Sequence, residues 1–215
     1  MKRYSVKKMV LLAMLSAIAY VLVSLIRIPV VLFLSYEPKD VVITIGGFLM
    51  GPMASLIVSL LVSLLEMVSI SQTGPVGCIM NFLSTCSFAC VAALVYKKRH
   101  TLSGAVLGLL LGSCAMVIVM LLWNWLITPL YMGVDRQTVE SMLIPTFLPF
   151  NLLKAGLNTA LTLGLYKPLV TVLRKIGLVE SAAGKASGSK AGIYALAGLL
   201  LVTCILLLLV FQGKL

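Results

Sequence analysis

Long apolar runs dominate this chain of 215 residues and limit what it can fold into. An α-helix rises about 1.5 Å per residue, so about 20 apolar residues cross the roughly 30 Å hydrocarbon core of a bilayer. With 61% hydrophobic residues, 11% charged residues and a mean hydropathy of +1.14, the sequence predicts an integral membrane protein. Runs long enough to span lie near residues 9–26, 78–96, 103–127, 145–168 and 192–211.

A further apolar stretch, residues 41–66, is interrupted by Gly51 and Pro52. This pair favours a tight turn, because proline cannot continue the hydrogen bonding of a preceding helix and glycine tolerates unusual backbone angles. We therefore expect two short helices here, the second and third of the chain. The fold class that follows is an all-α integral membrane protein, with a six-helix bundle over residues 1–177 and an additional C-terminal hydrophobic helix at 192–212.

Residues 178–191 separate that last helix from the bundle. They read LVESAAGKASGSKA and are small and polar, which is typical of a flexible linker. The hydrophobic run that follows has no internal charge and no polar stripe, so it resembles a plain membrane anchor. As a seventh crossing, it would bring Lys214 to the outside.

The net charge of +11 gathers in clusters that would all lie at one side of the membrane. One cluster precedes the first span, one lies at 97–99, and the largest follows the sixth helix. By the positive-inside rule this side is the cytoplasm, so we expect the N-terminus there and expect no nucleic acid partner. The opposite side receives 27–40, 67–77 and 128–144, which we expect to hold the longest non-helical sequence.

Few residues could carry catalysis. The chain has neither a glycine-rich phosphate loop ending in Lys-Ser/Thr nor an H-E-x-x-H helix. The single histidine, His100, lies in the basic loop and is expected to be solvated. The five cysteines include no C-x-x-C pair, so neither a zinc site nor a disulfide framework is indicated, and we interpret them as small packing residues. We therefore predict no enzyme, no metal site and no cofactor.

Polar residues within the spans are more informative, because each costs free energy in lipid and usually faces protein or a water-filled cavity. Asn151, Lys154 and Asn158 are spaced i, i+3 and i+7, which places them within about 60° of one another around a helix. We call these three residues the polar stripe. Two alternatives stay open: the stem of Lys154 could carry its amine up to the headgroups, and Asn158 could hydrogen-bond across to another helix.

Other polar and aromatic residues lie near the expected outer ends of the spans. Glu66 is a lone carboxylate there, and we expect a solvated helix terminus rather than a proton relay. Aromatic residues in the same region suit either an interfacial belt or stacking on a flat ligand. The polar candidates for a pocket opening outward are Asn81, Asn124 and Thr73, and the aromatic residues are Trp123, Trp125 and Tyr131.

The first span contains Ala13 and Ala17, four residues apart. A small-x-x-x-small pattern lets another helix approach closely in a membrane, where burial from water gives no drive for association. The pair therefore predicts either a docking face for another protein or internal packing against the other spans of this chain. The spacing alone does not separate these alternatives.

Taken together, several segments resemble the substrate-binding S components of energy-coupling factor (ECF) vitamin transporters, and specifically their riboflavin group. The segments that carry the resemblance are Ala13-x-x-x-Ala17, SYEPKDVVITIGGFLMGP at 35–52, TGPVGCIMNF at 73–82, NWLITPLY at 124–131 and PFNLLKAGLNTAL at 149–161. Their order covers roughly residues 5–175. The C-terminal hydrophobic helix departs from the pattern, since such a component ends after six helices.

The resemblance implies a non-catalytic subunit that captures riboflavin from outside, with its phosphate FMN as a further candidate ligand. By position, Asn124, Asn151 and Lys154 would bind the flavin, and Asp40 with the preceding loop would help to close over it. Asn81 and Thr73 are further candidates. The face formed by Ala13 and Ala17 would dock onto a membrane coupling subunit driven by two cytoplasmic ATPases.

Two alternatives to a riboflavin subunit stay open at this point. The polar stripe would also suit an S component for another vitamin, such as thiamine or a pyrimidine-like compound, and only the resemblance selects riboflavin. The second alternative is a non-transport membrane assembly protein whose alanine face is its whole purpose. The polar residues within the spans argue against that alternative, because a scaffold has no need of them.

Overall fold

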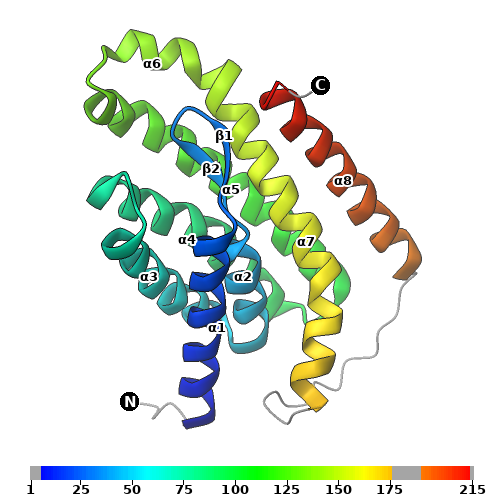
Figure 1. Ribbon diagram of the computed structural model, residues 1–215. Coiled ribbons are helices and arrows are strands. Elements are labelled where there is room, and N and C mark those ends of the chain that lie inside the picture. The colour runs from blue at the N-terminus through cyan, green and yellow to red at the C-terminus, as the bar shows by residue number, and fades with distance from the viewer. Residues whose placement is uncertain (1–5, 176–189, 214–215) are drawn as a thin grey trace.

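The computed structural model describes residues 6–175 and 190–213 and confirms a helical bundle (Figure 1). Most of the predicted linker, residues 178–189, lies outside the described residues. The elements follow the predicted apolar runs closely, with a few additions. In chain order they are α1 Val6–Leu25, β1 Ile28–Val31, β2 Leu34–Tyr36, α2 Lys39–Met50, α3 Pro52–Ser69, α4 Gly74–Lys98, α5 Leu102–Met132, α6 Arg136–Met142, the π-helical turn η1 Leu143–Phe147, α7 Leu148–Lys175 and α8 Lys190–Phe211.

The turn between α2 and α3 is formed as predicted by Gly51 and Pro52. Gly51 has a φ of +95°, which side-chain-bearing residues rarely adopt, and Pro52 begins α3, where no helical N–H is needed. The two helices differ in length: α2 has 12 residues, whereas α3 has 18 and is long enough to cross a membrane.

The centre of the bundle is α4, which packs against α2, α3 and α5. The contact between α4 and α5 is close because α5 presents glycines to the α4 backbone. A Cβ atom on Gly108 would lie 2.6 Å from the carbonyl oxygen of Ala92, and one on Gly112 would lie 2.5 Å from that of Phe88. Small residues at such crossings are the usual means of tight helix packing in membranes.

Two segments expected to be irregular are instead ordered. Residues 28–36 form an antiparallel hairpin of β1 and β2, in which Ile28 faces Tyr36. The longest non-helical sequence among the described residues, 26–38, coincides with the first of the three segments expected to hold it, whereas most of 128–144 is helical. The helix α5 continues to Met132 and α6 follows after a short turn. Asp135 explains the new start, because its side chain accepts a hydrogen bond from the backbone N–H of Thr138 as a helix N-cap.

Five of the described helices are long and apolar enough to cross a membrane: α1, α3, α4, α5 and the Tyr194–Phe211 part of α8. The 28-residue α7, which carries the polar stripe, is not among them because its asparagines and lysine lower its hydropathy. In Figure 1 the start of α1 and the end of α7 lie at the lower end of the bundle. The hairpin, α6 and the end of α8 lie at the upper end. We call these the lower and upper ends.

At the lower end, aromatic rings close the bundle between α2, α4 and α7. The rings of Phe48 and Tyr96 lie 4.5 Å apart, and the hydroxyls of Tyr96 and Tyr166 are hydrogen-bonded. His100 is exposed, as predicted, and its ring meets the edge of Tyr96 at 5.4 Å. This end is filled by side chains, whereas the upper end is hollow.

Candidate functional site: a cavity under the outer hairpin

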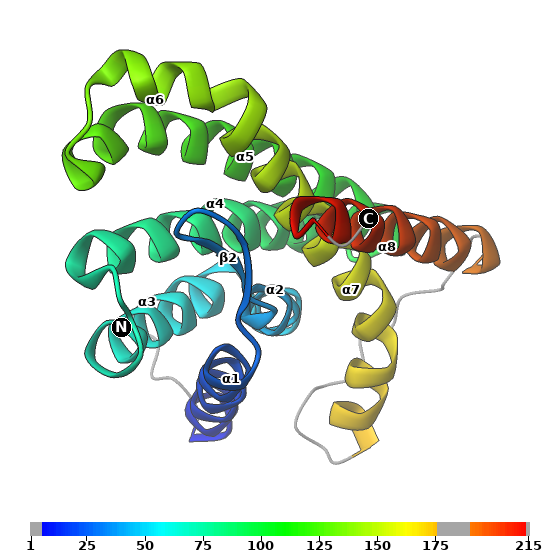
Figure 2. The same ribbon diagram turned by 45° about the horizontal axis from the view of Figure 1, so that its top comes forward.

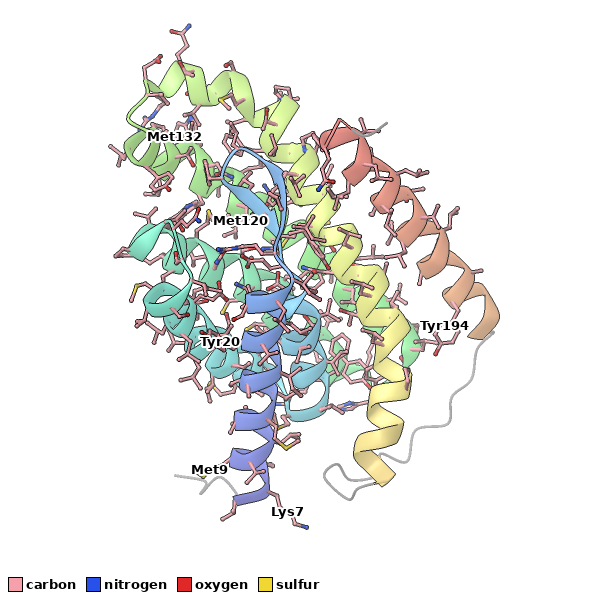
Figure 3. The ribbon with its side chains drawn as sticks, viewed as in Figure 1. Lys7, Met9, Tyr20, Met120, Met132 and Tyr194 are labelled. Atoms are coloured by element: carbon pink, nitrogen blue, oxygen red, sulfur yellow. The ribbon has the colours of Figure 1, made fainter. Side chains whose placement is uncertain are left out.

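A cavity of about 410 Å³ lies at the upper end, between the hairpin and helices α4, α5 and α7. Its volume falls within the range of small-molecule sites, roughly 300–1,000 Å³. Met120 of α5 lies beside the hairpin in Figure 3, and both line the cavity. The lining residues are Arg27, Pro29, Phe33, Leu34, Ser35, Glu37, Gln72, Thr73, Met80, Asn81, Ser84, Met120, Tyr131, Phe150, Asn151 and Lys154.

The polar stripe of α7 supplies two of the cavity's polar walls, Asn151 and Lys154. Asn151 is 2% exposed, and its side-chain nitrogen donates to the carbonyl oxygen of Phe147 at 2.8 Å. Lys154 is only 5% exposed, and its ammonium lies 3.4 Å from a carboxylate oxygen of Asp40. The amine therefore points into the protein, and the headgroup alternative for Lys154 is wrong.

Asp40 lies at the start of α2, fully buried, and is not among the residues that line the cavity. One of its oxygens accepts the Thr85 hydroxyl at 2.6 Å, and the other accepts the Asn158 amide at 3.1 Å. The predicted cross-helix role of Asn158 is thereby confirmed. Because Asp40 joins α2, α4 and α7 directly behind Lys154, it holds that ammonium in place from behind the cavity wall.

A second ionic network ties the hairpin to the bundle. Glu37, just after β2, accepts from Arg27 at 2.9 Å and pairs with Lys39 at 2.7 Å. Lys39, 1% exposed, also pairs with Glu66, whose other oxygen accepts from Asn81 at 2.9 Å. The expectation of a solvated Glu66 is wrong, because the residue is 1% exposed and has two polar partners.

The charges of this network balance, with two cations and two carboxylates in contact. Burial alone would raise the pKa of Glu37, but the neighbouring charges of Lys39, Lys154 and Arg27 oppose it and lower that pKa to about 2. Glu37 is therefore ionised throughout the physiological pH range. Buried charges are tolerated where each has a partner, so the network fixes the hairpin relative to α2, α3 and α4.

The other predicted site residues are divided between the cavity and its surroundings. Thr73 and Asn81 line the cavity. Asn124 is fully buried and does not line it: its amide donates to the Met120 carbonyl at 2.8 Å, and its oxygen accepts from Thr128 at 2.9 Å. Asn124 thus stiffens α5 next to Met120, and a contact with ligand would require these bonds to be exchanged.

The aromatic residues of this region also divide. Tyr131 lines the cavity, and its ring meets the edge of Phe33 from the hairpin at 5.4 Å. Trp125 instead donates to Glu140 at 2.9 Å and lies under Arg136, so it belongs to the outer surface. Trp123 is partly buried against the core. Stacking on a flat ligand is thus open to Phe33 and Tyr131.

Ala13 and Ala17 do not line the cavity and are both exposed on α1. The residues that α1 turns inward include Ser16 and Ala19, which are 7% and 0% exposed. The alternative that the alanine pair packs against other spans of this chain is therefore wrong. A docking role for the pair stays a prediction.

The sequence reasoning missed the hairpin and its ion pairs. Arg27, Glu37 and Lys39 flank or follow an apolar stretch, and their charges at the edge of a membrane segment were the available signal. Their partners could not be read from the sequence, because Glu66 lies 27 residues beyond Lys39. What the arrangement offers chemically is a pocket whose walls carry amide, ammonium, guanidinium, carboxylate and hydroxyl groups.

Comparisons with known proteins agree on one family. The family model described as "ECF transporter, substrate-specific component" matches residues 7–166. A riboflavin transporter RibU of Staphylococcus aureus (strain TCH60) is 30% identical over 179 residues, covering 79% of this chain and 94% of that protein. The riboflavin transporter FmnP of Bacillus subtilis (strain 168) is 32% identical over 161 residues, covering 69% and 84%.

A solved structure gives the same relationship at the level of the fold. It is described as "Structure and mechanism of the S component of a bacterial ECF transporter", and it shares 30% sequence identity with this chain. The TM-score is 0.67, over 78% of this chain and 98% of that one. The family match ends at residue 166, well before α8 begins at Lys190.

Proposed function

Because the chain belongs to the family of ECF transporter substrate-specific components, we propose that it captures riboflavin at the outer face of the cell membrane for import. The observation that carries this proposal is the polar stripe of α7 in the wall of a 410 Å³ cavity. Two relatives are named as riboflavin transporters, and the match to this chain covers 94% of one and 84% of the other. The ligand is cargo rather than a cofactor.

The groups on the cavity wall suit the flavin ring, whose polar edge alternates carbonyl, N–H and ring nitrogen. An asparagine amide such as that of Asn151 both donates and accepts, so it can pair with such an edge. Lys154 carries three donors, of which one faces Asp40, leaving others for a carbonyl or ribityl oxygen. A ligand without matching groups would leave these buried donors unpaired, which discriminates against it.

The flat faces of the ring require apolar walls. Phe33 on the hairpin and Tyr131 on α5 both line the cavity and contact each other edge to face. A flat ligand entering between the hairpin and the helices would gain stacking from these rings. The hairpin thus serves as one wall of the site, and the ion pairs of Glu37 hold that wall in place.

Transport requires partners that supply energy. We assign this role to a membrane coupling subunit and two cytoplasmic ATPases, with Ala13 and Ala17 as the surface that meets the coupling subunit. Their exposure on α1 supports the assignment, and α8 lies across α7 from α1 in both views of the ribbon, leaving that face uncovered (Figure 2). The chain itself would be non-catalytic, and its N-terminus cytoplasmic, as the positive-inside rule requires.

The test is a spectrum and a competition. The protein is purified in detergent from cells supplied with riboflavin, and its absorption is recorded after extensive washing. We expect flavin absorption that corresponds to about one ligand per chain. In the competition, bound labelled riboflavin should be displaced by unlabelled riboflavin and not by thiamine. A colourless protein that does not quench riboflavin fluorescence, or one that binds thiamine instead, would overturn the proposal.

A further inference from the structure

The C-terminal helix α8 has a narrow buried side, although most of its surface is open to lipid. Only 11% of its spanning part is buried, against 33–39% for the other spans of the described chain. Its large exposed residues include Leu199, Val202 and Leu206. On the opposite side Ala197 and Cys204 are 6% and 4% exposed. A helix that only anchored the chain in lipid would need no such buried side.

That buried side contacts α7 and the hairpin together. Cys204 belongs to one apolar cluster with Val30 and Tyr36 of the hairpin and Leu157 of α7. The approach is close at α7, where a Cβ atom on Gly156 would lie 2.6 Å from the Cys204 sulfur. The glycine thus leaves room for α8 to lie directly on α7 and to reach the hairpin behind the cavity.

The residue directly after α8, Gln212, also forms a polar contact with the hairpin. The side-chain nitrogen of Gln212 donates to the carbonyl oxygen of Pro29 at 3.1 Å. Pro29 lines the cavity and is in β1, which within residues 6–175 and 190–213 has a partner strand on one edge only. An unpaired strand edge has free backbone acceptors, so Gln212 satisfies one of them and fixes β1 at the same time.

We propose that α8 is an intramolecular brace that positions the hairpin over the cavity, with Cys204 and Gln212 as its positioning residues. A two-stranded hairpin is marginally stable by itself and needs support from neighbouring elements. Here the ion pairs of Glu37 hold it from the bundle side, and α8 holds it from behind. The brace therefore slows the opening of the hairpin and the escape of a bound ligand; the part concerning riboflavin rests on the proposed function.

The first arm of the test measures the hairpin without any ligand. A spin label is attached at the exposed hairpin tip through Leu32→Cys, in a full-length chain whose five native cysteines are replaced by alanine. Adding Cys204→Trp, in place of the alanine, should push α8 off α7 and increase the mobility of the label. Val202→Trp is the matched control, because Val202 is 55% exposed on the lipid side of the same helix and should leave the label unchanged.

The second arm measures riboflavin release by fluorescence. Gln212→Ala should raise the dissociation rate by about two- to tenfold, the worth of one neutral hydrogen bond, with little change in the association rate. Gln137→Ala, an exposed glutamine of α6, is the control and should leave both rates unchanged. A general loss of fold would lower the fraction of protein that binds riboflavin, and would not raise the dissociation rate while leaving the association rate unchanged.

The outcomes separate the brace from the proposed function. A mobile label with Cys204→Trp and a faster release with Gln212→Ala support the brace. If the label is no more mobile with Cys204→Trp than with Val202→Trp, or if Gln212→Ala releases riboflavin at the wild-type rate, α8 serves only as an anchor and the inference is overturned. If Cys204→Trp does not insert, label mobility in Gln212→Ala decides. If the wild-type chain binds no riboflavin, the proposed function fails, while the label still tests the brace.

Discussion

The outward face of α1 and the inward stripe of α7 are the two most telling helix surfaces of this protein, and they are opposite in character. On α1 the small residues Ala13 and Ala17 are exposed and have no polar group. On α7 Asn151 and Lys154 are buried, polar and directed at a cavity. Small exposed residues suit the approach of another helix, whereas buried polar groups suit a ligand with matching groups.

The difference teaches that binding and coupling are located on separate elements. The cavity draws its walls from the hairpin, α4, α5 and α7, and no lining residue comes from α1. A change on the α1 face should therefore alter transport without altering binding, and a change in the α7 stripe should alter binding first. The following predictions test this separation, beginning with the largest effect.

The largest effect is expected from the double substitution Ala13→Trp and Ala17→Trp. Two indole rings would hold a partner helix away and remove the close packing that binds it. Uptake of labelled riboflavin, in cells that also contain the coupling subunits, should fall to background, while binding to the purified chain stays at the wild-type level. Ile18→Trp is the control, because Ile18 is 46% exposed but lies about 100° around the helix from Ala17. Wild-type uptake by the double variant would remove the docking assignment.

The next largest effect is expected from Asp40→Ala, which leaves Lys154 without its buried partner. Removing one member of a buried ion pair costs about 3–5 kcal/mol. The free energy of unfolding in detergent should fall by about that amount, and riboflavin affinity should fall with it. Asp135→Ala removes an exposed helix cap and should lower the free energy of unfolding much less, with affinity retained. Equal losses from the two variants would contradict a central role for Asp40.

A smaller effect is expected from Lys154→Ala. Loss of a hydrogen bond to a charged donor costs about 1.5–3 kcal/mol, so the Kd for riboflavin should rise about 10- to 150-fold in a fluorescence titration. Leu152→Ala on the exposed side of the same helix should leave the Kd unchanged. An unchanged Kd for Lys154→Ala would mean that the ammonium serves only as the partner of Asp40.

The smallest effect is expected from acid. The pKa of Glu37 is lowered from 4.5 to about 2, so its stabilising ion pairs are complete above pH 4.5 and are lost as the pH falls towards 2. Riboflavin affinity should be constant from about pH 8 to pH 5 and decline below about pH 4. Glu37→Gln should bind more weakly at neutral pH and lose this acid decline. If the decline in riboflavin affinity were already complete at pH 5, a titrating group other than Glu37 would be responsible.

Much of the fold follows from hydrophobic length, and the exceptions have physical reasons. The six expected apolar stretches correspond to α1, α2 with α3, α4, α5, α7 and α8. The hairpin escaped prediction because its strands are only four and three residues long and Pro29 lies within the first. Its stability comes from contacts with Lys39 and α8, which are tertiary.

The candidate site was partly predictable for the same reason. Polar side chains on a membrane helix cost free energy when they face lipid, so they usually face protein or a cavity. The inward direction of Asn151 and Lys154 therefore followed from their helical spacing and from this cost. Glu66 was misjudged because its partner Lys39 is distant in sequence. Asp40 was placed against the ligand by resemblance, whereas the structure puts Thr85, Asn158 and Lys154 around it.

The most direct test of the central claim is a structure of this chain determined with riboflavin bound. The account predicts the flavin between the hairpin and helices α4, α5 and α7, with its polar edge within hydrogen-bond distance of Asn151 and Lys154. The ammonium of Lys154 should keep its contact with Asp40. A flavin bound elsewhere, or an empty cavity in a chain saturated with riboflavin, would contradict it.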